Sequence, residues 1–448
     1  MRRTINLTKG LNLAIGGGLT DLWPTGVAMP ATVAVVPADF PGFTPKCEVA
    51  EGDVVAQGQP LMRDKADTDI KLVSPVAGTV EAIVRGARRA IERIVVKPAA
   101  EGTPAQVKFE TDTKDAASVK RALKHSGLWA MMRQRPYDIV PDPTAEPRDI
   151  FVTAMDTAPL ALPLEEVVRG READLRAGVE ALAMLTKGTI YIGVAKGSAI
   201  ADIEGAEIVE FTPLHPAGNA GIQAANIAPV NKGETIWTLD VMTLARIGAL
   251  MTSGVADTSA TVAITGSEAD APHVVRTVVG ADIRALLGKE ADEAAPRHLR
   301  IISGNVLTGL PVGADGYLRY PYRQVTVIPE GDNADEFMGW ASLSPSKLSV
   351  SHSFPGSFLG RLFKPDARLN GGRRAMIMSG VYDRYLPMDI LPEYLLKAIS
   401  GKDIDQMEAL GIYEVAPEDF ALAEYADPSK LPLQKMVREG LDYLRSEV

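Results

Sequence analysis

The sequence predicts a multidomain protein that combines α+β and α/β modules. Its 448 residues correspond to about three domains of about 150 residues each. The 40 glycines and 31 prolines create many turns, which argues against a simple helical bundle. The hydrophobic pattern also changes along the chain, from short strands and turns, to alternating strands and helices, and finally to mostly helical segments.

The composition narrows the classes of function. Lys and Arg number 47 against 57 Asp and Glu, which gives a net charge of −10, and an acidic chain binds nucleic acid and anionic lipid poorly without specific contacts. Cys47 is the single cysteine. It cannot close an intrachain disulfide, complete a four-cysteine zinc site or hold an iron–sulfur cluster alone. Several common redox cofactors are therefore excluded.

The N-terminal segment, residues 1–30, is expected to be irregular and glycine-rich after one short strand. Arg2 and Arg3 are not followed by an apolar run of signal-peptide length. The weakly polar stretch 26–38 is interrupted by prolines and is shorter than the roughly 20 residues that span a bilayer. We therefore expect no membrane span and a cytoplasmic location, with partners holding the chain at any membrane where it works.

Residues 31–98 are expected to form short strands and tight turns. The segments EGDVVAQGQPL (51–61) and SPVAGTV (74–80) resemble the biotinyl/lipoyl family, whose fold is a small barrel-sandwich of two hairpin-rich halves. Lys65 lies near the position where that family carries biotin or lipoate, but the Met-Lys-Met setting is missing. A structural module is the favoured interpretation, and a carrier protein stays open as an alternative.

Residues 99–265 are expected to form a doubly wound, Rossmann-like α/β layer, because strand and helix patterns alternate there. The apolar cluster 129–132 is predicted to pack between domains. No Gly-x-Gly-x-x-Gly and no P-loop pattern occurs, which lowers the case for NAD, FAD or ATP binding. The predicted strands are 149–155, 189–194, 207–211, 235–239 and 261–264, and the main helices are 171–187 and the segment from Asp240 to Gly254.

The last two modules are a small β-grasp module of the SLBB type, over residues 266–330, and a mostly helical region, over 331–448. The first has strands at 274–281, 298–303 and 323–329 with a short helix at 282–288. The second has helices at 391–399, 403–410, 417–423 and 433–448, and the apolar stripe of the last one is predicted to dock on the rest of the protein.

Four motifs together resemble one family, the A subunit of the bacterial Na+-translocating NADH:quinone oxidoreductase. They are TKGLNLAIGG (8–17), SPVAGTVEAIVRGARRAIERIVV (74–96), HPAGNAG (215–221) and SGVYDRYLPMDILP (379–392). The resemblance covers nearly the whole chain. It implies a peripheral subunit on the cytoplasmic side of the bacterial inner membrane, in a complex that oxidises NADH, reduces ubiquinone and pumps Na+.

The resemblance also implies which partners and cofactors are involved. The partners would be five other subunits, B to F, and these would hold the FAD, FMN, riboflavin and iron–sulfur centres, so this chain would bind no cofactor of its own. The family is similar in layout to the flavin subunit of respiratory complex I and to the C subunit of the Rnf complex. An electron-input subunit that itself binds NADH and FMN is the alternative, which the missing glycine loop and the cysteine-free segment 426–430 disfavour.

No catalytic residue and no metal ligand is predicted, and two groups of residues are candidates for contacts. His215, Pro216 and Gly218 form a turn of the α/β layer, where ligands bind at the carboxyl ends of strands, and the imidazole could hydrogen-bond a quinone carbonyl. The other interpretation is a simple loop cap. Arg85, Arg88 and Arg89 concentrate positive charge in an acidic chain, and are predicted either to dock an acidic partner surface or to form a solvated hairpin end.

Overall fold

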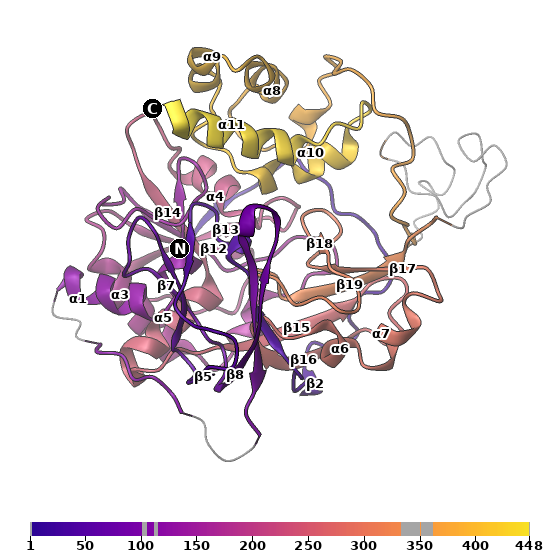
Figure 1. Cartoon of the computed structure of the whole chain (residues 1–448). Helices are drawn as coiled ribbons and strands as arrows, with labels where there is room; N and C mark the ends of the chain where they lie inside the picture. The colour runs from indigo at the N-terminus through magenta and orange to yellow at the C-terminus, as the bar shows by residue number, and fades with distance from the viewer. Residues whose placement is uncertain (1, 101–104, 112–114, 333–349, 351–361, 448) are drawn as a thin grey trace.

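The computed structural model describes residues 2–100, 105–111, 115–332, 350 and 362–447. These residues form two six-stranded sheets, two smaller antiparallel sheets and a group of helices from the C-terminal part of the chain. In Figure 1 the C-terminal helices lie together at the top of the view, above the two large sheets. In the described part of the chain no helix is both long enough and apolar enough to cross a bilayer.

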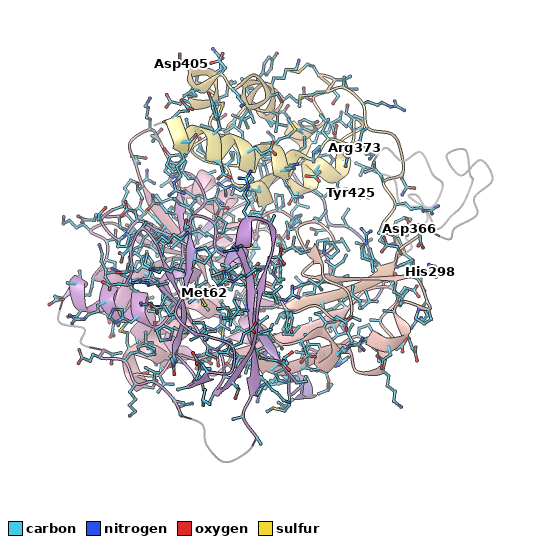
Figure 2. All side chains as sticks on the ribbon, viewed as in Figure 1. Met62, His298, Asp366, Arg373, Asp405 and Tyr425 are labelled. Carbon is cyan, nitrogen blue, oxygen red and sulfur yellow. The ribbon has the colours of Figure 1, made fainter. Side chains whose placement is uncertain are left out.

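The two smaller sheets form the predicted hairpin-rich module. Its sheets have the strand orders β3-β9-β8-β5 and β4-β6-β7, and all their pairings are antiparallel. Leu61, Met62 and Ile94 are fully buried between them, and Met62 lies inside the module in Figure 2. The strands are β3 (Val33–Val35), β4 (Pro45–Cys47), β5 (Val54–Val55), β6 (Pro60–Asp64), β7 (Lys71–Val73), β8 (Gly78–Arg85) and β9 (Ile91–Pro98).

The first large sheet forms the α/β layer, with the strand order β1-β13-β12-β11-β14-β10. Its pairings are parallel except for the edge strand β10. The strands are β1 (Arg3–Ile5), β10 (Arg133–Arg135), β11 (Ile150–Thr153), β12 (Ile190–Ala195), β13 (Ala206–Phe211) and β14 (Ile236–Asp240). The predicted mixed α/β architecture is therefore confirmed, and the N-terminal segment adds an unpredicted edge strand to it.

Helices cover both faces of this sheet, because successive residues of a strand point to opposite faces. Ile150 and Val152 of β11 share a core cluster with the helices α3 (Glu172–Ala183) and α5 (Val241–Ser253). Phe151 packs instead with Ala224 of α4 (Ala220–Ile227). A Cβ atom on Gly248 of α5 would lie 1.8 Å from the Asp174 carbonyl oxygen, so glycine permits the close approach of α3 and α5.

The segment before the sheet joins the first two modules into one core. It contains α1 (Ala116–His125) and the 3₁₀ turn η3 (Trp129–Met131), and α2 (Leu164–Val167) follows β11. Trp129 is fully buried, meets Trp237 of β14 edge to face at 5.1 Å, and belongs to a cluster that also contains Leu61 of the hairpin-rich module. The predicted packing of residues 129–132 between domains is confirmed.

The second large sheet is mixed, with the strand order β18-β17-β19-β15-β16-β2. The sequence predicts that residues 261–264 close the α/β layer, but β15 pairs here with β16 and β19. Its apolar alternation predicts a half-buried strand without specifying which sheet it joins. The elements are β2 (Pro24–Val27), β15 (Ser259–Thr265), β16 (His273–Val278), β17 (Leu299–Ser303), β18 (Leu310–Pro311), β19 (Gln324–Pro329), α6 (Ile283–Leu287) and α7 (Lys289–Glu293).

The C-terminal helices agree closely with the predicted ones, although residues 333–349 and 351–361 of the predicted helical region lie outside the described residues. Leu433, Val437, Leu441 and Leu444 form the apolar stripe of α11 and are fully buried, so the predicted docking of this helix is confirmed. The elements are η6 (Tyr382–Arg384), α8 (Pro392–Gly401), α9 (Ile404–Ala409), η7 (Pro417–Phe420), α10 (Ala421–Ala426) and α11 (Leu433–Glu447).

Candidate functional site

The loop that carries His215 lies at the carboxyl edge of the parallel sheet. It follows β13 and is fixed to the residues that follow β11. The Thr157 Oγ1 atom lies 3.2 Å from His215 Nδ1 and accepts a hydrogen bond of 2.9 Å from the Gly218 backbone N–H. Thr153 Oγ1 in turn donates to the Gly218 carbonyl oxygen at 2.8 Å. The structure thus places His215, Pro216 and Gly218 at the sheet edge where ligands bind in open α/β sheets.

The N-terminal segment covers this loop. Asn12 Oδ1 accepts a hydrogen bond of 2.8 Å from the His215 backbone N–H, and the Leu11 N–H donates to the His215 carbonyl oxygen at 2.9 Å. Gly10 has φ +140°, and a Cβ atom there would lie 2.2 Å from the His215 carbonyl oxygen. Because the cover is this close, His215 is only 4% exposed.

Burial also sets the charge state of His215. It lowers the pKa of the imidazole to about 4, because the charged form loses its hydration. The ring is therefore neutral at physiological pH. Its Nε2 atom is buried and has no hydrogen-bond partner among the described residues. A neutral ring with one unpaired nitrogen can still exchange a hydrogen bond with a polar ligand atom.

A buried ion pair lies beneath the N-terminus of α4. The side chains of Arg135 and Asp419 are 1% and 0% exposed, and Arg135 Nη1 lies 3.0 Å from Asp419 Oδ2. Arg135 Nη1 also donates to the Glu414 carbonyl oxygen at 2.9 Å, which fastens the C-terminal region to the α/β layer. The pair is not apparent from the sequence, because an isolated arginine before Pro136 has no local feature that separates it from a surface arginine.

The predicted docking arginines lie at the tip of the β8–β9 hairpin, around the 3₁₀ turn η2 (Ala87–Arg89). Arg85, Arg88 and Arg89 are all exposed. Arg85 Nη1 donates to the Arg89 carbonyl oxygen at 3.2 Å, and none of the three forms an ion pair with a carboxylate of the described chain. The tip therefore presents three uncompensated positive charges, as either interpretation of the sequence requires.

The remaining candidates from the sequence lie apart from this edge. Lys65 is exposed in the turn that follows β6. Cys47 is partly buried, and its Sγ atom donates to the Val49 carbonyl oxygen at 3.1 Å. Within the described ranges, no three His, Cys, Asp or Glu side chains converge as metal ligands would.

Comparison with known families decides the relationship. Family models match the chain in three consecutive blocks. Residues 5–99 match the NqrA N-terminal barrel-sandwich hybrid domain, residues 114–256 the NqrA second alpha/beta domain, and residues 261–313 the NQRA C-terminal domain. The NqrA protein of the Na(+)-translocating NADH-quinone reductase from Neisseria meningitidis serogroup C is 36% identical over 453 residues, covering 99% of this chain and 100% of the relative. The chain belongs to the NqrA family.

Other relatives agree with this assignment. The NqrA proteins of Pasteurella multocida and Shewanella frigidimarina are each 36% identical over 99% of this chain and 100% of their own length. Among solved structures, a chain from the crystal structure of an NAD+-reducing [NiFe]-hydrogenase in the air-oxidized state aligns over 49% of this chain and 48% of its own length, with 16% identity and a TM-score of 0.34. The barrel-sandwich module predicted for residues 31–98 is confirmed by the first family model.

Proposed function

We propose that the chain is the peripheral NqrA component of a Na+-pumping NADH:quinone reductase that couples NADH oxidation and quinone reduction to Na+ export. Similarity along the full length of proteins that carry this name supports the proposal. The NADH:ubiquinone reductase activity belongs to the whole complex, and the isolated chain lacks a complete active site. Its place is the cytoplasmic side of the bacterial inner membrane, where five other subunits, B to F, hold it.

The protein contributes no redox cofactor of its own in this proposal. The missing glycine loop and the single cysteine support that role, since flavin and iron–sulfur chemistry needs such residues. FAD, FMN, riboflavin and the iron–sulfur centre then belong to the partner subunits. An absorbance spectrum of the purified chain separates this role from the alternative NADH- and FMN-binding role, because a bound flavin has a visible absorption band.

The internal folds are proposed to be those of related redox proteins. Taken in chain order from β11, the strands β13-β12-β11-β14 run 3-2-1-4, which supports a Rossmann-like origin of the α/β layer. A β-grasp fold of the SLBB type is proposed for the sheet that contains β15 to β19. The position of β15 in a hairpin with β16, beside β19, supports this as a compact separate module.

The hairpin-tip arginines are proposed to dock an acidic surface of a partner subunit. Reversing Arg88 and Arg89 to Glu is expected to reduce retention of the chain in the complex about tenfold or more, because like charges then face each other. The measurement is co-purification of the five partners with the tagged chain from membranes. A matched control reverses Arg176 and Lys187, two exposed cations on and just beyond α3.

The outcomes separate two levels of the proposal. Full retention of the Arg88→Glu/Arg89→Glu variant would assign the tip to solvent. Absence of the five partners from the wild-type preparation would overturn the proposed role in the complex itself.

A second proposal is that the loop of His215, Pro216 and Gly218 contacts the quinone. The unpaired Nε2 atom at the carboxyl edge of the sheet favours it. In the assembled complex, His215→Gln is expected to raise KM for quinone about tenfold while NADH oxidation with an artificial electron acceptor stays unchanged, since one hydrogen bond is lost. An unchanged KM for quinone would return this loop to a purely structural role.

A further inference from the structure

A cavity of about 90 Å³ lies where four parts of the chain meet, away from the loop of His215. Leu72 of the barrel-sandwich module, Leu128 of the connecting segment, Arg246 of α5 and Leu318, which precedes β19, all line it. At about 30 Å³ per water molecule, the space equals about three waters. The rim includes Pro321, which is exposed, so the cavity lies close to the surface.

Arg246 brings an uncompensated positive charge to this cavity. The residue is 3% exposed. Its Nη2 donates to the Ser259 carbonyl oxygen at 2.7 Å, and its Nη1 reaches only the Met131 sulfur, at 3.9 Å. The Nε atom is buried without a hydrogen-bond partner in the described part of the chain, and no described carboxylate pairs with the guanidinium. An unpaired buried charge is costly, so such a group is normally matched by an anion.

The carboxylates that line the cavity already have cations of their own. Asp39 accepts two hydrogen bonds from Arg319 Nε, at 2.8 and 3.0 Å, and a third from the Tyr320 backbone N–H at 3.1 Å. Asp257 pairs with Arg171, whose Nη1 lies 2.8 Å from its Oδ2. Neither aspartate is therefore free to neutralise Arg246.

The third arginine of the lining, Arg323, pairs with Asp240 at 2.5 Å. Arg246 is thus the one surplus charge among these paired groups. Burial, together with the charge of Arg323, lowers the pKa of Arg246, as expected for a cation without its counterion.

We propose that this cavity binds a small monocarboxylate, with the carboxylate on Arg246 and the short alkyl end against Leu72, Leu128 and Leu318. A planar guanidinium matches a carboxylate through paired hydrogen bonds. The single surplus charge favours a monoanion, because phosphate carries about −1.5 to −2 at neutral pH and would leave excess negative charge in the cavity. The apolar walls favour a ligand with a short hydrocarbon end over a fully polar ion.

The test measures thermal unfolding of the full-length protein in sodium acetate or sodium propionate. Sodium chloride and sodium phosphate at the same pH and ionic strength serve as references. Tm is expected to rise with the logarithm of carboxylate concentration, by about 3 °C at one hundred times the dissociation constant. Equal Tm values in acetate and chloride would overturn the proposal, as would a phosphate effect as large as that of acetate.

Two variants tie the effect to Arg246. Arg246→Met is expected to lose the carboxylate-dependent shift, whereas Arg176→Met, the same substitution at an exposed position of α3, keeps it. If Arg246→Met does not fold, Arg246→Lys supplies the test, because it keeps the charge but not the planar pair of donors and should weaken acetate binding about tenfold. Acetate binding of wild-type strength in the folded Arg246 variant contradicts the proposal.

Discussion

Replacing Arg135 by Ala is expected to lower the free energy of unfolding by about 3–5 kcal/mol. The substitution leaves the Asp419 carboxylate, which is 0% exposed, without its cation. Asp419 keeps the 2.9 Å hydrogen bond from the Ala416 N–H, but one neutral donor does not replace a guanidinium. The loss should concentrate where the C-terminal helices meet α4, because Arg135 also holds the Glu414 carbonyl oxygen.

Urea unfolding measures the total loss, and amide hydrogen exchange locates it. Exchange is expected to accelerate in α4, η7 and α11 before it does in the barrel-sandwich module. The double variant Arg135→Met/Asp419→Leu should recover part of the stability, since it removes both buried charges. The partly exposed pair Arg300 and Glu330 is the control, and Arg300→Ala should cost less than about 1 kcal/mol. A similarly small loss for Arg135→Ala would show that the pair is not the fastening.

Local signals explain how much of the fold could be predicted. The predicted starts of α5 and α9 follow Asp240 and Asp403, and these side chains cap the helices by accepting from the Thr243 N–H at 2.7 Å and the Gln406 N–H at 3.1 Å. A cap and the periodicity behind it lie within one short window of sequence. The strand pattern of the barrel-sandwich module is similarly local.

Sheet membership and buried pairs could not be predicted, because they depend on residues far apart in the chain. The short N-terminal strands β1 and β2 join two different sheets. Arg135 and Asp419 are separated by 284 positions, and their pairing becomes apparent only once the C-terminal helices dock.

The same distinction applies to the loop of His215. Its place at the carboxyl edge of the sheet followed from the alternation of strands and helices. Its burial beneath Asn12, 203 positions away, did not. The sequence could therefore place the candidate residue but not its charge state, which the covering segment determines.

His215 should make the folded state sensitive to acid by about 3 kcal/mol. The pKa of its imidazole falls from 6.5 to about 4 on folding, and each pKa unit corresponds to about 1.4 kcal/mol. Between these two values the unfolded chain binds the proton and the folded chain does not, so stability rises with pH across this window. The contribution is complete above about pH 6.5 and is lost as the pH falls through about 4.

Urea unfolding at about pH 7 and about pH 4.5 compares the wild type with His215→Gln. The wild type should lose about 2–3 kcal/mol more than the variant between the two conditions, because glutamine does not titrate. The control is His125→Gln, at a side chain that is 43% exposed, and it should follow the wild type. Parallel pH profiles for wild type and His215→Gln would mean that the imidazole is solvated or paired in the folded protein. The unpaired, neutral ring on which the quinone contact depends would then be absent.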